Sequence, residues 1–213
     1  MTYPEILFKI PDSPFLDLFR SKLERKFANS ELNRAYRAEL SFYEKGQLVK
    51  GVLEMDGKPQ EMYFLNHGTE FIHLNFTNFP VYSFNEDHGI RLNAENVIDY
   101  ICFFFGYVRG PHGAFIPMGN AGELIRALHI DKDREVTSVT DEEEVISYSE
   151  MPVGKEKEMI TAKFVSPKVL NPGSLGPLEV DISLLFKDSL FYSRVHVERN
   201  GMVSINNEKL LLE

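Results

Sequence analysis

The segment Arg109-Gly110-Pro111-His112-Gly113 holds the residue types in this chain that are best suited to bind a small molecule and act on it. An arginine can hold a carboxylate or a phosphate through two parallel hydrogen bonds, and a histidine can exchange a proton near neutral pH. Glycines let the backbone adopt positive φ angles or approach a ligand closely. A site in this loop would bind a small acidic ligand through the arginine. The expected ligand-binding residues are Arg109, Gly110, His112 and Gly113.

A structural interpretation of the same residues competes with this one. The sequence Gly-Pro directly after an apolar helix is an ordinary way to end the helix, and Arg109 would then only bind its last carbonyl groups. The carboxyl end of a helix carries a partial negative charge, which disfavours anions. An acidic ligand at this loop must therefore depend on Arg109 and not on the helix.

The element that positions this loop is an apolar helix, expected at about residues 94–108. Asn93 is suited to cap its first turn, and Glu95 lies where negative charge is favoured. The apolar side chains point in nearly every direction, so the helix must be covered on most sides. Cys102 lies within it and is expected to behave as a small buried hydrophobe.

The six histidines are natural candidates for metal ligands, yet their spacing matches no established zinc motif. A site formed by His67, His73 and His88 is conceivable, with Asp87 or Glu70 as a fourth ligand. Solvated loop and sheet histidines are the more common arrangement. The acidic run 141–144 lacks the alternating spacing of a calcium loop, and the chain has no phosphate-binding or dinucleotide-binding glycine motif. We therefore expect neither a metal nor a cofactor.

The rest of the chain predicts strands and two further helices. Ser13 and Pro14 open an amphipathic helix at about 14–28, and Asn120 opens a short helix at 121–129. A hairpin turn is expected at Asp56-Gly57-Lys58, and a type I′ turn at Asn200-Gly201. The expected strands are 35–43, 47–55, 61–65, 70–76, 81–84, 115–117, 136–139, 145–148, 159–165, 178–186, 190–198 and 202–205. This pattern predicts a single α+β domain over residues 1–213, with antiparallel β-meanders packed around the central apolar helix.

Composition limits the classes of protein to which this chain can belong. With 213 residues and 43% hydrophobic content, it can bury a sizeable core. The net charge of −9 disfavours nucleic-acid binding, and the apolar run 97–108 is shorter than the roughly 20 residues that cross a bilayer. A single cysteine allows no intrachain disulfide, and the N-terminus lacks the features of a signal peptide. The sequence therefore predicts no nucleic-acid partner, no membrane partner and a cytoplasmic location.

No catalytic motif identifies a reaction, so two functional hypotheses remain. The first is a non-enzymatic binding or interaction protein, expected to form a homodimer. The basic face of the first helix could pair with the segment 131–158, which has ten acidic and four basic residues, between subunits or within one. The alternative is an enzyme or sensor for a small acidic ligand, in which Arg109 binds the acid and His112 transfers a proton. We favour the first hypothesis.

Overall fold

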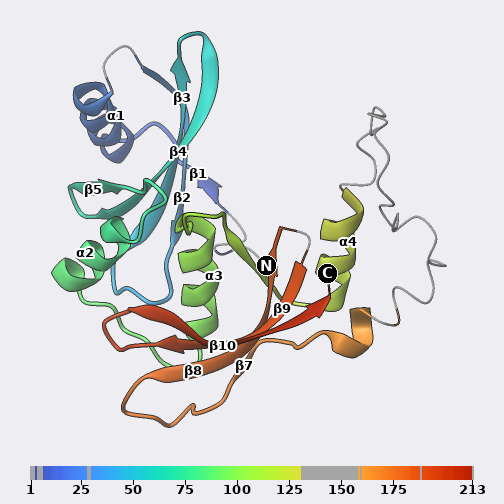
Figure 1. Ribbon diagram of the computed structural model, residues 1–213. Helices are drawn as coiled ribbons and strands as arrows, with labels where there is room; N and C mark the ends of the chain where they lie inside the picture. Colours follow the sequence, from blue (N-terminus) through green and yellow to red (C-terminus); the bar gives the residue numbers. More distant parts are fainter. Residues whose placement is uncertain are drawn as a thin grey trace, which may run out of the picture.

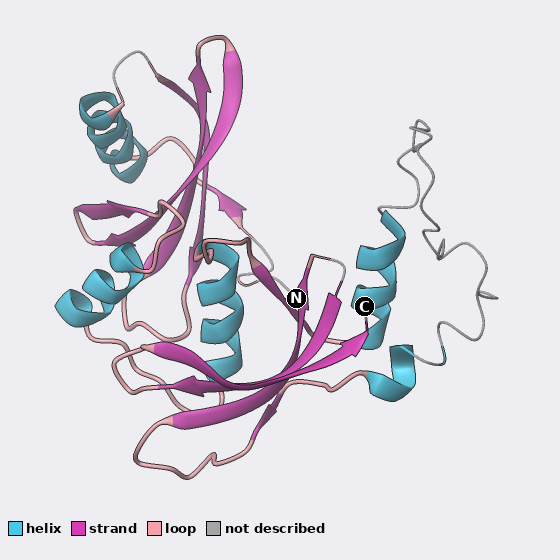
Figure 2. Ribbon diagram, in the orientation of Figure 1, coloured by secondary structure: helices cyan, strands magenta, loops and turns pink. Residues whose placement is uncertain are grey.

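The computed structural model of this chain describes residues 3, 7–27, 30–130, 158, 160–187 and 189–212. Within them the fold is α+β, with two antiparallel sheets and helices between and beside them (Figures 1 and 2). The first sheet has the strand order β1-β2-β3-β4-β5. The second has the order β10-β9-β8-β6, with β7 paired to β8. The α+β class and the antiparallel sheets predicted from the sequence are therefore confirmed.

A helical turn at residues 160–163 carries no label. The labelled helices and strands have these bounds, in chain order. They are β1 (Phe8–Lys9), α1 (Pro14–Lys26), β2 (Glu31–Glu39), β3 (Gln47–Met55), β4 (Lys58–His67), β5 (Glu70–His73), α2 (Phe79–His88), α3 (Val97–Tyr107), β6 (Phe115–Met118), α4 (Ala121–Ile130), β7 (Lys168–Val169), β8 (Leu178–Phe186), β9 (Ser189–Val197) and β10 (Val203–Leu212).

Helix α1 covers one face of the first sheet, and its start agrees with the sequence. The side chain of Ser13 accepts a hydrogen bond from the backbone N–H of Leu16 at 3.4 Å, and proline occupies the first helical position. Phe19 and Leu23 are buried on the inner face of the helix. Phe19 packs edge-on against Phe64 of β4 at 5.3 Å between ring centres. This contact fixes α1 on the sheet.

Helix α3 connects the cores of the two sheets. Its buried residues are Val97, Tyr100, Ile101, Cys102, Phe103, Phe104 and Phe105. All of these except Cys102 share a hydrophobic cluster with Leu48 and Leu65 of the first sheet and with Leu184 and Val195 of the second. Figure 1 shows α3 between the two sheets. The chain therefore leaves this core directly into the loop that follows Tyr107. No helix in the described ranges is both long and apolar enough to cross a bilayer.

The two glycine turns predicted from the sequence have different outcomes. At Asp56-Gly57 both φ angles are positive, 51° and 73°, and Met55 pairs directly with Lys58, so the predicted turn is confirmed and is a two-residue turn of type I′. Lys58, predicted as part of the turn, is the first residue of β4. At Asn200-Gly201 the predicted type is wrong, because only Gly201 has a positive φ angle and the connection between the two strands covers residues 198–202. The side chain of Arg199 donates to three carbonyl oxygens outside the hairpin and holds this longer loop.

Two strand predictions are wrong. Residues 81–84 lie inside α2, which begins after Asn78, has Pro80 in its first turn and ends before Gly89, where φ is 68°. A four-residue segment is too short to distinguish strand from helix by its period, and these flanking residues favour the helix. Residues 160–163 form a helical turn where a strand was predicted at 159–165, because Ile160 and Phe164 pack into one hydrophobic cluster beside α4. The predictions for 136–139 and 145–148 lie outside the described residues.

Candidate functional site

Arg109 is held over an aromatic ring at the point where α3 ends. Val108 forms a parallel β-bridge with Phe76, and the backbone N–H of Arg109 donates to the carbonyl oxygen of Phe76 at 2.8 Å. The guanidinium carbon lies 4.0 Å from the centre of the Phe76 ring. A guanidinium stacked in this way has one face shielded from water, while its edge N–H groups remain available to an anion.

Phe76 adopts a backbone conformation that phenylalanine normally avoids. Its φ angle is 65°, in the left-handed region, where a bulky residue costs roughly 1–3 kcal/mol. Asn75 stabilises the turn, since its side-chain oxygen accepts from the backbone N–H of Thr77 at 3.1 Å and from its hydroxyl at 2.7 Å. The Phe76 side chain is 37% exposed, so burial alone does not account for the strain. Strained residues that persist at such positions cluster at functional sites.

A groove of about 400 Å³, which we call the Arg109 groove, lies beside this pair. Its floor is aromatic: the rings of Tyr82 and Phe104 stack 5.7 Å apart, and those of Phe105 and Phe115 meet edge-on at 6.0 Å. The lining residues are Thr77, Asn78, Tyr82, Phe104, Phe105, Val108, Arg109, Gly110, Pro111, Phe115 and Val203. Arg109 is the only charged residue among them, so the groove joins one cation to an apolar surface.

The electrostatics of the Arg109 groove favour an anion. Within the described part of the chain, no carboxylate pairs with Arg109. Thr77 and Asn78 line the groove and directly precede α2, so the partially positive amino end of that helix lies at the same place. Asn78 forms no side-chain cap on α2. The partial negative charge at the carboxyl end of α3, which disfavours an anion, is therefore offset by the partial positive charge at the amino end of α2.

The structure separates the site residues that the sequence grouped together. Arg109 and Gly110 line the groove, whereas His112 and Gly113 do not. The backbones of Gly110 and Gly113 exchange two hydrogen bonds of 2.9 and 3.2 Å, so these N–H groups are used within the turn. His112 is exposed at the tip of that turn. Position 113 favours glycine for structural reasons, because its φ angle is 138° and a Cβ there would lie 3.2 Å from Phe186.

The histidine cluster considered from the sequence does not converge on one point. His67 and His88 stack with ring centres 4.4 Å apart, and His88 contacts Glu70 at 2.9 Å. His73 instead packs among the aromatic residues under α1, where burial lowers the pKa of its imidazole. In the described ranges, no group of three His, Cys, Asp or Glu side chains could hold a metal ion. The structure thus gives no support to the His67/His73/His88 arrangement.

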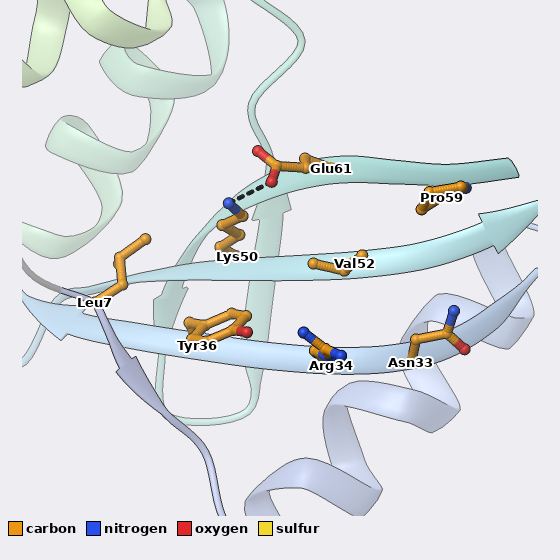
Figure 3. A pocket seen from close by; sticks show the side chains of 8 residues that line it. All are labelled: Leu7, Asn33, Arg34, Tyr36, Lys50, Val52, Pro59 and Glu61. Carbon is orange, nitrogen blue, oxygen red and sulfur yellow. Dashed lines mark ion pairs between the residues drawn. The ribbon is translucent and has the colours of Figure 1, made fainter.

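A second groove, which we call the sheet groove, lies on the face of the first sheet opposite α1 and has a volume of about 770 Å³ (Figure 3). Lys50 lies between the rings of Tyr36 and Tyr63, 5.9 and 5.8 Å from their centres, and pairs with Glu61 at 2.5 Å. The hydroxyl of Tyr63 donates to Glu61 at 2.9 Å. The hydrogen bonds from Lys50 and then Tyr63 lower the pKa of Glu61. The charge of Lys50 is therefore neutralised inside the groove.

A third polar cluster is buried and holds three elements together. Tyr43 donates its hydroxyl hydrogen to Asn85 Oδ1. Asn85 Nδ2 donates to Tyr100 Oη at 3.0 Å and to the Asn200 carbonyl at 3.2 Å, and Tyr100 donates to the Gly201 carbonyl at 2.6 Å. Every side-chain donor in the cluster has an acceptor. Burial raises the pKa of both tyrosines, so the cluster links α2, α3 and the β9–β10 loop and does not exchange protons.

No protein-family model, curated protein or solved structure matches this chain. Its function must therefore be inferred from the two grooves themselves. Each groove is lined by a cation that lies against aromatic rings. Lys50 in the sheet groove is paired with Glu61, whereas Arg109 has no carboxylate partner within the described residues. The Arg109 groove is the stronger candidate site.

Proposed function

We propose that this protein is a non-enzymatic binding protein that takes a small carboxylic acid with an apolar body in the Arg109 groove. The observation that carries the proposal is the guanidinium of Arg109 fixed over Phe76 at an aromatic groove. The guanidinium supplies two parallel N–H donors for a carboxylate, and the groove supplies apolar contact for the rest of the molecule. The proposal joins the two hypotheses drawn from the sequence, a binding protein and an acidic ligand.

The lining of the Arg109 groove favours binding without proton transfer. The described side chains that line it include no His, Cys, Asp or Glu. The hydroxyl oxygen of Tyr82 accepts from the backbone N–H of Val203 at 3.2 Å, and burial raises the pKa of Tyr82. His112, the base in the enzyme alternative, does not line the groove. The enzyme alternative would therefore need another base.

Saturation-transfer NMR with a panel of small acids tests this proposal. The probes are phenylacetate, indole-3-acetate and octanoate, each measured beside its neutral amide. We expect at least one acid to bind about tenfold or more tightly than its amide, because a hydrogen bond to a charged group contributes about 1.5–3 kcal/mol. Arg109→Gln should remove this preference and leave Tm nearly unchanged, since Arg109 is exposed.

The matched control for this experiment is Arg37→Gln. Arg37 also lies over a phenylalanine ring, that of Phe15 at 5.4 Å, but on the α1 side of the first sheet. Its replacement should leave the binding of the acid intact. The proposal is wrong if none of the acids binds, or if Arg109→Gln binds the acid as well as the unmodified protein does. A large fall of Tm in Arg109→Gln would assign that arginine a structural role.

Three further expectations from the sequence stand as parts of this proposal: one domain in which both meanders pack around α3, a cytoplasmic location, and a homodimer. One argument for a homodimer no longer applies, because the buried face of α3 is covered within a single chain. Native mass spectrometry with a denatured control distinguishes monomer from dimer. An excess mass that is lost on denaturation would also identify a retained ligand.

A further inference from the structure

The Arg109 groove holds a second polar group, the side-chain amide of Asn78. Asn78 lines the groove together with Arg109 and lies directly before α2. Its side chain does not cap α2, and within the described ranges it has no hydrogen-bond partner. A carboxamide has both an acceptor oxygen and N–H donors, so it can bond to the N–H and the C=O of a peptide group. The groove therefore has a place for an amide as well as for a carboxylate.

The two polar groups lie close enough to bind one molecule. The backbone N–H of Arg109 donates to the carbonyl oxygen of Phe76 at 2.8 Å, and the guanidinium lies over the ring of the same phenylalanine. Asn78 follows Phe76 by two residues, a span of at most about 7 Å along the chain. In a peptide, a single Cα atom separates the terminal carboxylate from the nitrogen of the last amide. Arg109 and Asn78 therefore suit the two polar groups of one C-terminal residue.

The charge of the lining distinguishes an amide nitrogen from an amino group. A free amino acid carries an ammonium beside its carboxylate, and a charge taken out of water needs an opposite charge next to it. The described residues that line the groove include no Asp or Glu, and Arg109 repels a second cation. The nitrogen beside the bound carboxylate must therefore be neutral, as it is in a peptide bond.

An exposed phenylalanine continues the apolar surface beyond the groove. Phe79, in the first turn of α2, is 74% exposed. It precedes Tyr82, which lines the groove, by three residues, so the two rings lie on the same face of the helix. The groove volume of about 400 Å³ is near the lower end of the range of about 300–1,000 Å³ found for small-molecule sites. A ligand that also covers Phe79 must therefore extend out of the groove.

We propose that the acid bound in the Arg109 groove is the C-terminal residue of a peptide from a partner protein. Arg109 binds the terminal carboxylate, and Asn78 binds the last amide group. The last side chain is apolar and packs on the aromatic floor of the groove, and an apolar side chain upstream covers Phe79. Capture of a C-terminal carboxylate is a recurring mode of peptide recognition. The inference rests on the proposed function, because it names the source of the carboxylate that Arg109 binds.

Isothermal titration calorimetry on the full chain tests these contacts one at a time. N-acetyl-L-phenylalanine should bind about fivefold more tightly than 3-phenylpropanoate, because it adds an amide that bonds to Asn78. It should also bind more tightly than N-acetyl-D-phenylalanine, since contacts at the carboxylate, the amide and the side chain together distinguish the two enantiomers. The tripeptide N-acetyl-valyl-leucyl-phenylalanine should bind about tenfold more tightly again, because it covers Phe79. Its C-terminal amide should bind at least about tenfold more weakly than the free acid.

Two variants, each with a matched control, assign the contacts to their residues. Asn78→Ala should remove the preference for N-acetyl-L-phenylalanine over 3-phenylpropanoate, whereas Asn33→Ala, at an exposed asparagine of β2, should keep it. Phe79→Ser should remove the additional affinity of the tripeptide. Phe8→Ser, at a phenylalanine of β1 that is 68% exposed, should keep that affinity.

The results separate this inference from the proposed function on which it rests. If 3-phenylpropanoate and the other acids do not bind, both are overturned. If 3-phenylpropanoate binds but N-acetyl-L-phenylalanine binds no better, only the peptide inference is overturned. The same holds if the two enantiomers bind equally, if the tripeptide amide binds as well as the acid, or if either variant behaves like its control.

Discussion

Replacing Gly201 with alanine would place a methyl group inside the buried hydrogen-bond cluster of Asn85 and Tyr100. A Cβ at this position would lie 2.7 Å from Tyr100 Oη and closer still to Asn85 Nδ2, so both side chains would have to move. Gly201 also has a φ angle of 84°, and an L-residue adopts the left-handed region at a cost of about 1–2 kcal/mol. The substitution therefore combines a backbone cost with the loss of buried hydrogen bonds.

The magnitude follows from these two contributions. A buried polar group that loses its partner costs about 1–3 kcal/mol, so Gly201→Ala should lower the free energy of unfolding by about 3 kcal/mol in total. In a chain of this length that corresponds to a fall in Tm of roughly 6–12 °C. Gly57→Ala is the control, because its φ angle is 73° but nothing lies within 4 Å of the added Cβ. It should show the backbone cost alone.

Urea denaturation followed by circular dichroism measures the difference between these two variants. Repeating Gly201→Ala in an Asn85→Ala background should reduce its effect, because the nearest obstacle to the added methyl group is then absent. Equal losses of stability in Gly201→Ala and Gly57→Ala would refute the reasoning. They would mean that the cluster around Asn85 relaxes without cost.

Three further predictions concern the core, a helix cap and a surface ion pair. Burial raises the pKa of Cys102 to about 12, so Ellman's reagent should find no reactive thiol in the folded protein and one in denaturant. Asn120→Ala should lower the free energy of unfolding by about 1 kcal/mol, because Asn120 Oδ1 accepts from the backbone N–H of Glu123 at 2.9 Å at the start of α4. The hydrogen bonds from Arg194 lower the pKa of Asp181 in the folded protein. The pair therefore stabilises the fold at pH values above the unfolded pKa of about 3.9, and this stabilisation is lost as the pH falls through the lower pKa of the folded state. Acid denaturation monitored by circular dichroism should therefore show a weaker pH dependence below pH about 4 in Asp181→Asn.

The elements predicted best are those whose local signals agree with their burial. The bounds of β3 match the prediction 47–55, because apolar alternation and the Asp56-Gly57 turn define them together. For β2 the prediction 35–43 is displaced from Glu31–Glu39. Residues 31–34 are mostly polar because they form an exposed edge. Leu40, Phe42 and Tyr43 are apolar because they belong to a turn that fills the core, and all three are buried. Hydrophobicity therefore indicated burial there and not strand structure.

The candidate site was predicted only in part, for a physical reason. Arg109 could be identified from its place after an apolar helix, but its platform, Phe76, is far away in the sequence and has a backbone conformation that no propensity favours. The sheet groove was missed because Tyr36, Lys50 and Tyr63 become neighbours only through strand register. Local patterns do not reveal which residues of separate strands face one another.

Lys50 and Arg109 both lie against aromatic rings, and their different surroundings predict losses of stability of different size when each charge is removed. Lys50 is largely covered and pairs with Glu61, so Lys50→Met should cost about 1 kcal/mol of stability, a value kept small by the solvent that reaches Glu61. Arg109 is exposed and has no carboxylate partner in the described ranges, so Arg109→Gln should change stability by less than about 0.5 kcal/mol. If urea denaturation instead shows the larger loss in Arg109→Gln, the arginine serves mainly to close the loop onto Phe76. Its charge would then have a structural explanation, and an acidic ligand would no longer be needed to account for it.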